Sequence, residues 1–78
     1  MSLIQNRGNK IRTINEIKEG ELYLISSPIH KDLLVKVTKQ MSGSILASVF
    51  GESKNTQLKQ FDWNQDFVMG EEEIYSVA

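Results

Sequence analysis

The feature that most constrains the fold of this chain is a series of short apolar runs, spaced about ten residues apart, in which apolar and polar side chains alternate. The clearest run places Leu33, Val35 and Val37 on one face and polar or mixed residues on the other. A period of two is typical of a β-strand with one buried face. No helical pattern is long enough to cover a parallel sheet, so the sequence predicts an all-β, antiparallel fold.

Strands are predicted wherever such runs are closed by turn residues. The first covers residues 22–25 and ends before Pro28, which lacks a backbone donor. The next two, residues 33–38 and 44–50, flank a glycine-containing hairpin loop of three to five residues and are predicted to pair. A short fourth strand covers 57–61, residues 67–69 extend or replace it, and residues 73–77 are predicted to pair with an early strand. Strand boundaries between 56 and 72 stay open.

The chain also carries one signal for a helical turn. Thr13 and Glu16 have the spacing of a capping box, and Gly20 follows where a positive φ ends the turn. One short turn within residues 14–19 is therefore predicted. Residues 1–12 are polar without either period, and we interpret them as a flexible basic arm before a single domain of residues 13–78. An alternative is a longer helix over residues 3–19 that packs on the sheet.

The size of the chain favours a small closed or nearly closed sheet. The 78 residues include no cysteine, so neither disulfides nor thiolate-bound zinc supplement the core. The economical arrangement is a strongly bent, partly open antiparallel barrel of four or five strands. This pattern is similar to that of SH3-like and Tudor-like barrels, in which a short helical turn and a glycine often precede the first long strand.

Charge is distributed unevenly along the chain, although the formal net charge is only -1. Residues 1–18 carry +3 and residues 62–78 carry -5. A sequence pI near 5.7 gives little support to nucleic-acid binding, which usually requires an excess of lysine and arginine. No apolar run approaches the roughly 18 residues of a membrane-spanning helix, and no secretory segment is visible. The sequence therefore predicts a cytoplasmic location and no membrane association.

Candidate catalytic groups are few. His30 is the only histidine and lies in a predicted loop near Asp32, but no Gly-x-Ser-x-Gly turn accompanies it. We therefore expect an exposed loop histidine, no enzyme activity and no cofactor.

One spacing matches part of a calcium-binding loop. Oxygen donors stand at positions 1, 3, 5 and 12 of that loop, in the residues Asp62, Asn64, Asp66 and Glu73. Position 6, where the sharp turn requires glycine, is Phe67, and no amphipathic helix flanks the segment. We predict a polar turn with no metal, and keep calcium binding as the weaker alternative.

The remaining candidates are aromatic and basic side chains. Trp63 lies between two polar residues, and the sequence leaves open whether it covers the core or contacts a partner. In the second case an exposed aromatic groove would comprise some of Trp63, Tyr23, Phe61, Phe67 and Tyr75. The leading hypothesis is a small non-catalytic protein-binding module, such as a phage or bacterial accessory protein that acts on a larger partner by surface complementarity.

The alternative function is nucleic-acid binding. It would use the basic arm and a strand face through Arg7, Lys10, Arg12, Lys36, Lys39 and Lys59. The chain is expected to be a monomer or a homodimer formed through an edge strand.

Overall fold

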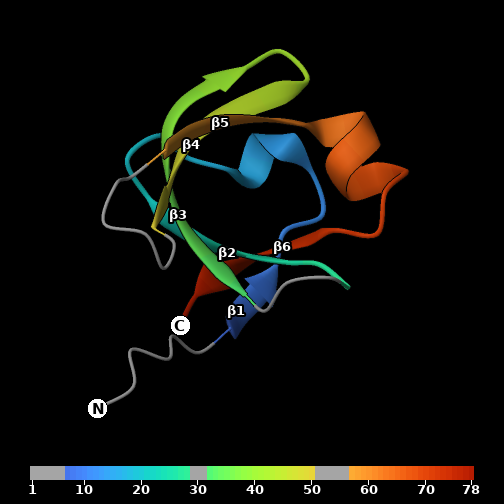
Figure 1. Ribbon diagram of the computed structural model, residues 1–78, viewed down its shortest axis with the longest axis horizontal. Coiled ribbons are helices and arrows are strands. Elements are labelled where there is room, and N and C mark those ends of the chain that lie inside the picture. Colours follow the sequence, from blue (N-terminus) through green and yellow to red (C-terminus); the bar gives the residue numbers. More distant parts are fainter. Residues whose placement is uncertain (1–6, 29–31, 51–56) are drawn as a thin grey trace.

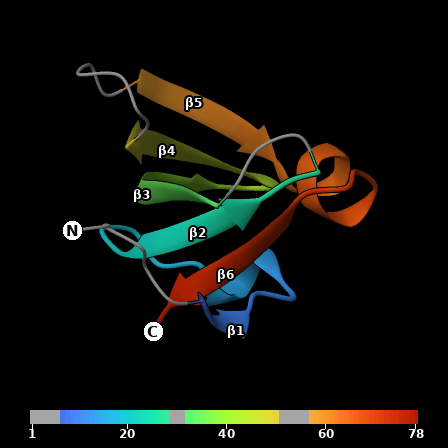
Figure 2. The ribbon, with the colours of Figure 1, turned by 60° about the horizontal axis from the view of Figure 1, so that its bottom comes forward.

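The described residues form one antiparallel sheet of six strands with almost no helix (Figure 1). The structure, a computed structural model, describes residues 7–28, 32–50 and 57–78. Its elements are β1 (Arg7–Lys10), the 3₁₀ turn η1 (Ile14–Glu16), β2 (Leu22–Ser26), β3 (Leu33–Met41), β4 (Ser44–Phe50), β5 (Gln57–Asp62), the π-helical turn η2 (Trp63–Val68) and β6 (Glu73–Val77). The strands lie in the order β1-β6-β2-β3-β4-β5 (Figure 2). The predicted all-β, antiparallel class is confirmed.

The core lies on the inner face of the bent sheet. Val35 and Val37 on β3 are fully buried, as is Ala47, which pairs with Val37. Ile45 pairs with Phe61 on β5, and both are 1% exposed. The alternation read in the sequence therefore decides which face of β3 and β4 is buried.

The hairpin between β3 and β4 confirms the predicted antiparallel pair. Its turn is tighter than expected, because Met41 already pairs with Ser44 and only two residues connect the strands. β3 reaches that far because its register shifts between Val37 and Lys39, as in a β-bulge.

The predicted helical turn is present as η1. The Glu16 carboxylate accepts the backbone N–H groups of Arg12 and Thr13, each at 2.8 Å, which completes a capping box. Gly20 has a φ of 85°, and its N–H donates to the carbonyl of Val37 at 2.7 Å. The longer helix over residues 3–19 is wrong, because residues 7–10 form a strand.

The arm predicted over residues 1–12 differs from the structure at residues 7–11. Arg7–Lys10 form β1, which pairs with β6, and the Ile11 N–H donates to the Ile74 carbonyl at 2.8 Å. Ile11 is itself buried. β1 could not be predicted from the sequence, because it is a short edge strand with mostly exposed side chains and therefore shows no alternation of apolar and polar residues. Residues 1–6 lie outside the described residues.

Residues 67–69, which were expected to extend or replace a strand, do not form one. Phe67 and Val68 instead end η2, and the Met69 N–H donates to the Asn64 carbonyl at 2.7 Å. η2 begins at Trp63 because the carboxylate of Asp62, the residue before it, accepts the first free N–H groups of the turn, those of Asn64 and Gln65.

The last strand pairs with an early strand, as predicted, since β6 lies between β2 and β1. Among the described residues, no pairing joins the outer strands β1 and β5, so the sheet is not closed. Within the same residues, no helix is long and apolar enough to cross a membrane.

Candidate functional site

A pocket of about 290 Å³ opens where the end of β1, the start of β6 and η2 meet. Its apolar lining comes from Ile11, Trp63, Phe67, Val68 and Ile74, and its charged lining from Lys10, Arg12 and Glu73. The opening is large enough for one or two side chains of a binding partner.

Aromatic side chains form one wall of the pocket. The rings of Trp63 and Phe67 are tilted, with centroids 5.3 Å apart, and Phe67 lies 5.9 Å from Phe61. Phe61 is buried beneath them, whereas Trp63 and Phe67 are half-buried and pack against the core. The aromatic wall is therefore supported by the buried ring of Phe61, while the rings of Trp63 and Phe67 are partly accessible.

The charged rim of the pocket is net positive. Lys10 Nζ lies 2.7 Å from Glu73 Oε2, and this pair raises the pKa of Lys10 and lowers the pKa of Glu73 through its hydrogen bond. Arg12 is exposed and belongs to neither of the ion pairs found among the described residues, although its charge contributes to lowering the pKa of Glu16, whose carboxylate accepts the Arg12 N–H. A carboxylate on a ligand would therefore find an available cation at the rim.

The predicted aromatic groove is only partly assembled. Trp63 and Phe67 line the pocket and Phe61 supports them, but Tyr23 is 4% exposed and its hydroxyl accepts the Lys18 N–H at 2.8 Å. Tyr75 lies outside the pocket lining, next to Arg7.

Sequence reasoning missed three of the apolar residues that line the pocket. Ile11 and Ile74 meet across β1 and β6, and Val68 lies at the end of η2. The only local signal was the β-branched and aromatic run of residues 73–77, which contains Ile74, because the contact of Ile11 depends on a strand that the sequence does not reveal.

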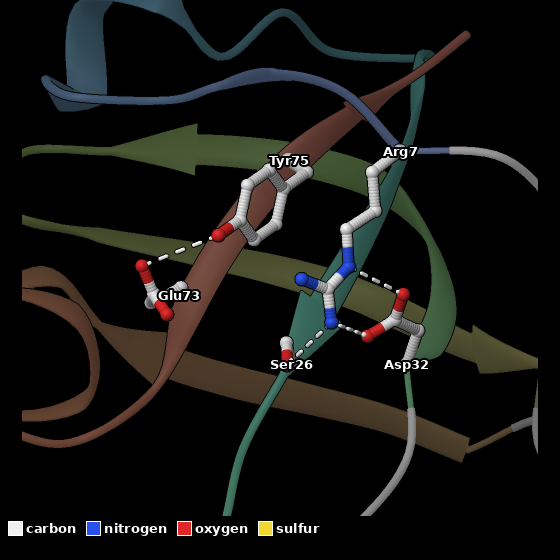
Figure 3. A network of polar contacts seen from close by, with 5 residues as sticks. All are labelled: Arg7, Ser26, Asp32, Glu73 and Tyr75. Carbon is white, nitrogen blue, oxygen red and sulfur yellow. Dashed lines mark hydrogen bonds and ion pairs between the residues drawn. The ribbon is translucent and has the colours of Figure 1, made fainter.

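Away from the pocket, a network of polar contacts around Arg7 connects β1 to the rest of the sheet (Figure 3). Arg7 donates two hydrogen bonds to the Asp32 carboxylate, from Nε to Oδ2 at 2.8 Å and from Nη2 to Oδ1 at 2.7 Å. Its Nη2 also donates to the hydroxyl oxygen of Ser26 at 3.0 Å. Its guanidinium carbon lies 4.7 Å from the ring centroid of Tyr75, whose hydroxyl donates to Glu73 at 3.3 Å. Since these groups satisfy one another, we assign the cluster a structural role.

This cluster predicts loss of stability in acid. The hydrogen bonds from Arg7 lower the pKa of Asp32, so the folded state holds this carboxylate ionised more firmly than the unfolded chain does. The contribution is present above the ordinary Asp pKa of about 3.9 and is lost as the pH falls through the lower folded pKa. We expect urea unfolding to show a smaller fall in stability between pH 7 and pH 3 for Asp32→Asn than for the wild type. An equal fall in both proteins would contradict the assignment.

The basic residues of the nucleic-acid alternative do not share one face. Arg7 and Lys10 are engaged in ion pairs, Lys36 lies on the outer face of β3, and Lys59 lies 5.1 Å from the Phe61 ring centroid on the inner side of β5. Lys39 follows the bulge in β3. Only Lys10 and Arg12 of this set line the pocket.

The candidate calcium ligands are used in other ways. Asp62 and Asp66 accept backbone N–H groups at the two sides of the η2 start, and Glu73 pairs with Lys10. The described part of the chain contains no group of three or more acidic, histidine or cysteine side chains placed to hold a metal ion. His30 lies outside the described residues.

Comparison with known proteins adds no relative: no protein-family model, curated protein or solved structure matches the chain.

Proposed function

We propose that this protein is a small non-catalytic binding module that receives an apolar side chain of a partner protein in the pocket between β1, β6 and η2. The observation that carries the proposal is the half-buried Trp63, which lines a pocket of about 290 Å³ together with Phe67 and Ile74. Buried aromatic anchors surrounded by charged residues are typical of sites that dominate protein–protein affinity.

The charged residues at the rim of the pocket indicate which kind of partner segment binds there. Lys10 is balanced by Glu73, which leaves Arg12 as the cation available to a ligand. The expected ligand is a partner segment in which an aromatic or large aliphatic residue stands next to an Asp or Glu. A carboxylate held by Arg12 would orient the segment while the apolar side chain fills the pocket.

Nucleic-acid binding has less support, because the basic residues are spread over different faces and two of them are paired with carboxylates. A phosphate-binding surface needs several cations on one groove, with stacking aromatics between them.

The partly open, SH3-like barrel belongs to the same proposal, as does a cytoplasmic location. Three features support the barrel: the meander from β2 to β5, the return of β6 to β2, and the short helical turn before β2. Modules of this shape commonly bind peptides in shallow apolar grooves rather than catalyse reactions.

The decisive experiment is affinity capture with quantitative mass spectrometry, using the wild type, Val68→Asp and Leu58→Asp as baits. Val68 lines the pocket and is 58% exposed, so a carboxylate there should block the pocket without unfolding the protein. We expect recovery of a specific partner to fall about tenfold for Val68→Asp, as for loss of a contact worth about 1.4 kcal/mol.

Leu58→Asp is the matched control, because Leu58 is 64% exposed and lies away from the pocket. It should capture the partner as the wild type does. Equal recovery with all three baits would remove the pocket from the proposal, and loss of the partner after nuclease treatment would favour nucleic-acid binding instead.

A further inference from the structure

The strand β1 is held to the sheet by fewer contacts than any other strand. It lies at the edge of the sheet and, among the described residues, pairs with β6 alone (Figure 2). None of its four residues is buried, whereas each of the other five strands carries at least one buried apolar side chain. Segments with few buried apolar contacts and exposed backbone hydrogen bonds open more readily than the core does.

The backbone pairing of β1 is also irregular. Three residue steps of β1, from Arg7 to Lys10, lie opposite only two steps of β6, as at a β-bulge. Within this interval the Asn9 N–H donates to the side-chain hydroxyl of Ser76 at 2.8 Å, and this hydrogen bond is exposed. A bulge disrupts the ladder locally, so the middle of β1 adds little to its attachment.

Two exposed ion pairs hold the ends of β1. Arg7 Nη2 lies 2.7 Å from Asp32 Oδ1, and Lys10 Nζ lies 2.7 Å from Glu73 Oε2. The side chains of Arg7 and Lys10 are 46% and 49% exposed, so dissolved salt screens both pairs. The hydrogen bond from Arg7 to Ser26 is exposed as well. The position of β1 beside β6 therefore depends on interactions that ionic strength weakens.

Firm attachment begins at the residue after β1. Ile11 is 8% exposed and belongs to the core, and its N–H donates to the Ile74 carbonyl at 2.8 Å. The next N–H, that of Arg12, donates to the Glu16 carboxylate at 2.8 Å. Ile11 is therefore the point about which residues 7–10 can move away from β6 while the other strands keep their core.

We propose that β1 is a strap hinged at Ile11, which leaves β6 without unfolding of the other five strands and whose closure completes the charged rim of the pocket. Lys10 is the residue of β1 that lines the pocket, so it moves with the strap. The closed strap gives the rim two cations, Lys10 and Arg12, and one anion, Glu73. The open strap leaves Arg12 and Glu73, which balance each other. Ionic strength thus controls how often the pocket has a net positive rim.

Native-state hydrogen exchange of the whole chain, followed by NMR, tests the hinge at Ile11. The Asn9 N–H reports on β1, and the Val37 N–H, which donates to the Glu21 carbonyl at 3.1 Å, reports on the core. We expect Asn9 to be at least about tenfold less protected than Ile11 and Val37. Its exchange should stay constant in dilute urea, because opening of β1 exposes little surface, whereas exchange of Ile11 and Val37 should become faster.

Variants at the two ion pairs test whether β1 opens as one unit. Lys10→Gln and Asp32→Asn each remove one exposed pair, and each should lower the protection of the Asn9 N–H about two- to fivefold. Lys10→Gln should also lower the protection of the Arg7 Nε–H, which donates to Asp32 at the other end of β1. Lys36→Gln is the matched control, because Lys36 is an exposed lysine on β3, which does not neighbour β1. It should leave both protections unchanged.

The same exchange in low and high salt tests the control by ionic strength. Between about 20 mM and about 500 mM NaCl, the protection of the Asn9 N–H should fall about three- to tenfold in the wild type. The double variant Lys10→Gln/Asp32→Asn lacks both pairs and should show a much smaller fall.

Four results would overturn the proposal. Equal protection of Asn9 and Ile11 means that β1 does not open about Ile11, and an Asn9 N–H that exchanges as in an unfolded peptide means that β1 is not closed. Protection of Asn9 that ignores both variants indicates fluctuation of one residue. An equal salt response in the wild type and the double variant shows that salt acts elsewhere. These measurements use the free protein, so they stand apart from the proposed function, on which only the binding of a partner carboxylate at the closed rim rests.

Discussion

Replacing Phe61 with alanine is expected to remove about 3–5 kcal/mol from the free energy of unfolding. Phe61 is 1% exposed, pairs with Ile45 across β4 and β5, and lies beneath the ring of Phe67. The loss combines the transfer free energy of the ring with the cost of the cavity that remains, because a close-packed core relaxes only partly into such a cavity. A domain of this size has about 5–15 kcal/mol of stability in total, so the loss is a large fraction of it.

The measurement is urea unfolding followed by far-UV circular dichroism, together with a thermal melt. For a domain of this size a loss of 3 kcal/mol lowers Tm by at least about 12 °C. Leu58→Ala on the same strand is the control, because Leu58 is 64% exposed and should change stability by no more than about 0.5–1 kcal/mol. If Phe61→Ala melts like this control, Phe61 is a surface residue and returns to the set of partner contacts.

β5 also shows where sequence analysis reaches its limit. Leu58 and Phe61 lie on opposite faces of the strand, so only one of them can face the core, and the structure buries Phe61 and exposes Leu58. A shift of one residue exchanges the two faces of a strand, so the register with β4 decides the outcome. That register pairs Ile45 with Phe61, a contact between segments that the local pattern does not relate.

Strands with strong alternation were predictable, whereas an edge strand without it was not. β2, β3, β4 and β6 fall where the sequence predicted them because apolar β-formers alternate or cluster there. β1 depends on Arg7 reaching Asp32, on Lys10 reaching Glu73, and on pairing with β6 near the other end of the chain. No local pattern encodes such contacts.

The candidate site was visible only in part for the same reason. Trp63 stood out because its neighbours in sequence are polar, and the structure places it half-buried in the pocket wall. The pocket itself is lined by residues 10–12, 63, 67–68 and 73–74, which come together only when β1 pairs with β6 and η2 packs beside β6. Spacing along the chain therefore identified one wall and not the cavity.

The second large effect is expected for Gly70→Ala, at the end of η2. A Cβ at this position would lie 2.3 Å from the carbonyl oxygen of Gln65 and 3.0 Å from that of Asp66. Both contacts are with the backbone, which cannot rotate away as a side chain does. Forcing an extra carbon into such a site costs about 1–3 kcal/mol, because the last residues of η2 must move.

Movement of η2 should also change the environment of Trp63, the only tryptophan of the chain. Unfolding in urea measures the stability, and near-UV circular dichroism and tryptophan fluorescence of the folded state report the movement. Gly20→Ala is the matched control, because no atom lies within 4 Å of the added carbon and the cost of about 1 kcal/mol arises from its φ of 85° alone. The control should lose stability with an unchanged tryptophan signal. If Gly70→Ala also leaves that signal unchanged, η2 tolerates the extra carbon, and the pocket wall does not depend on the close approach of Gly70 to Gln65.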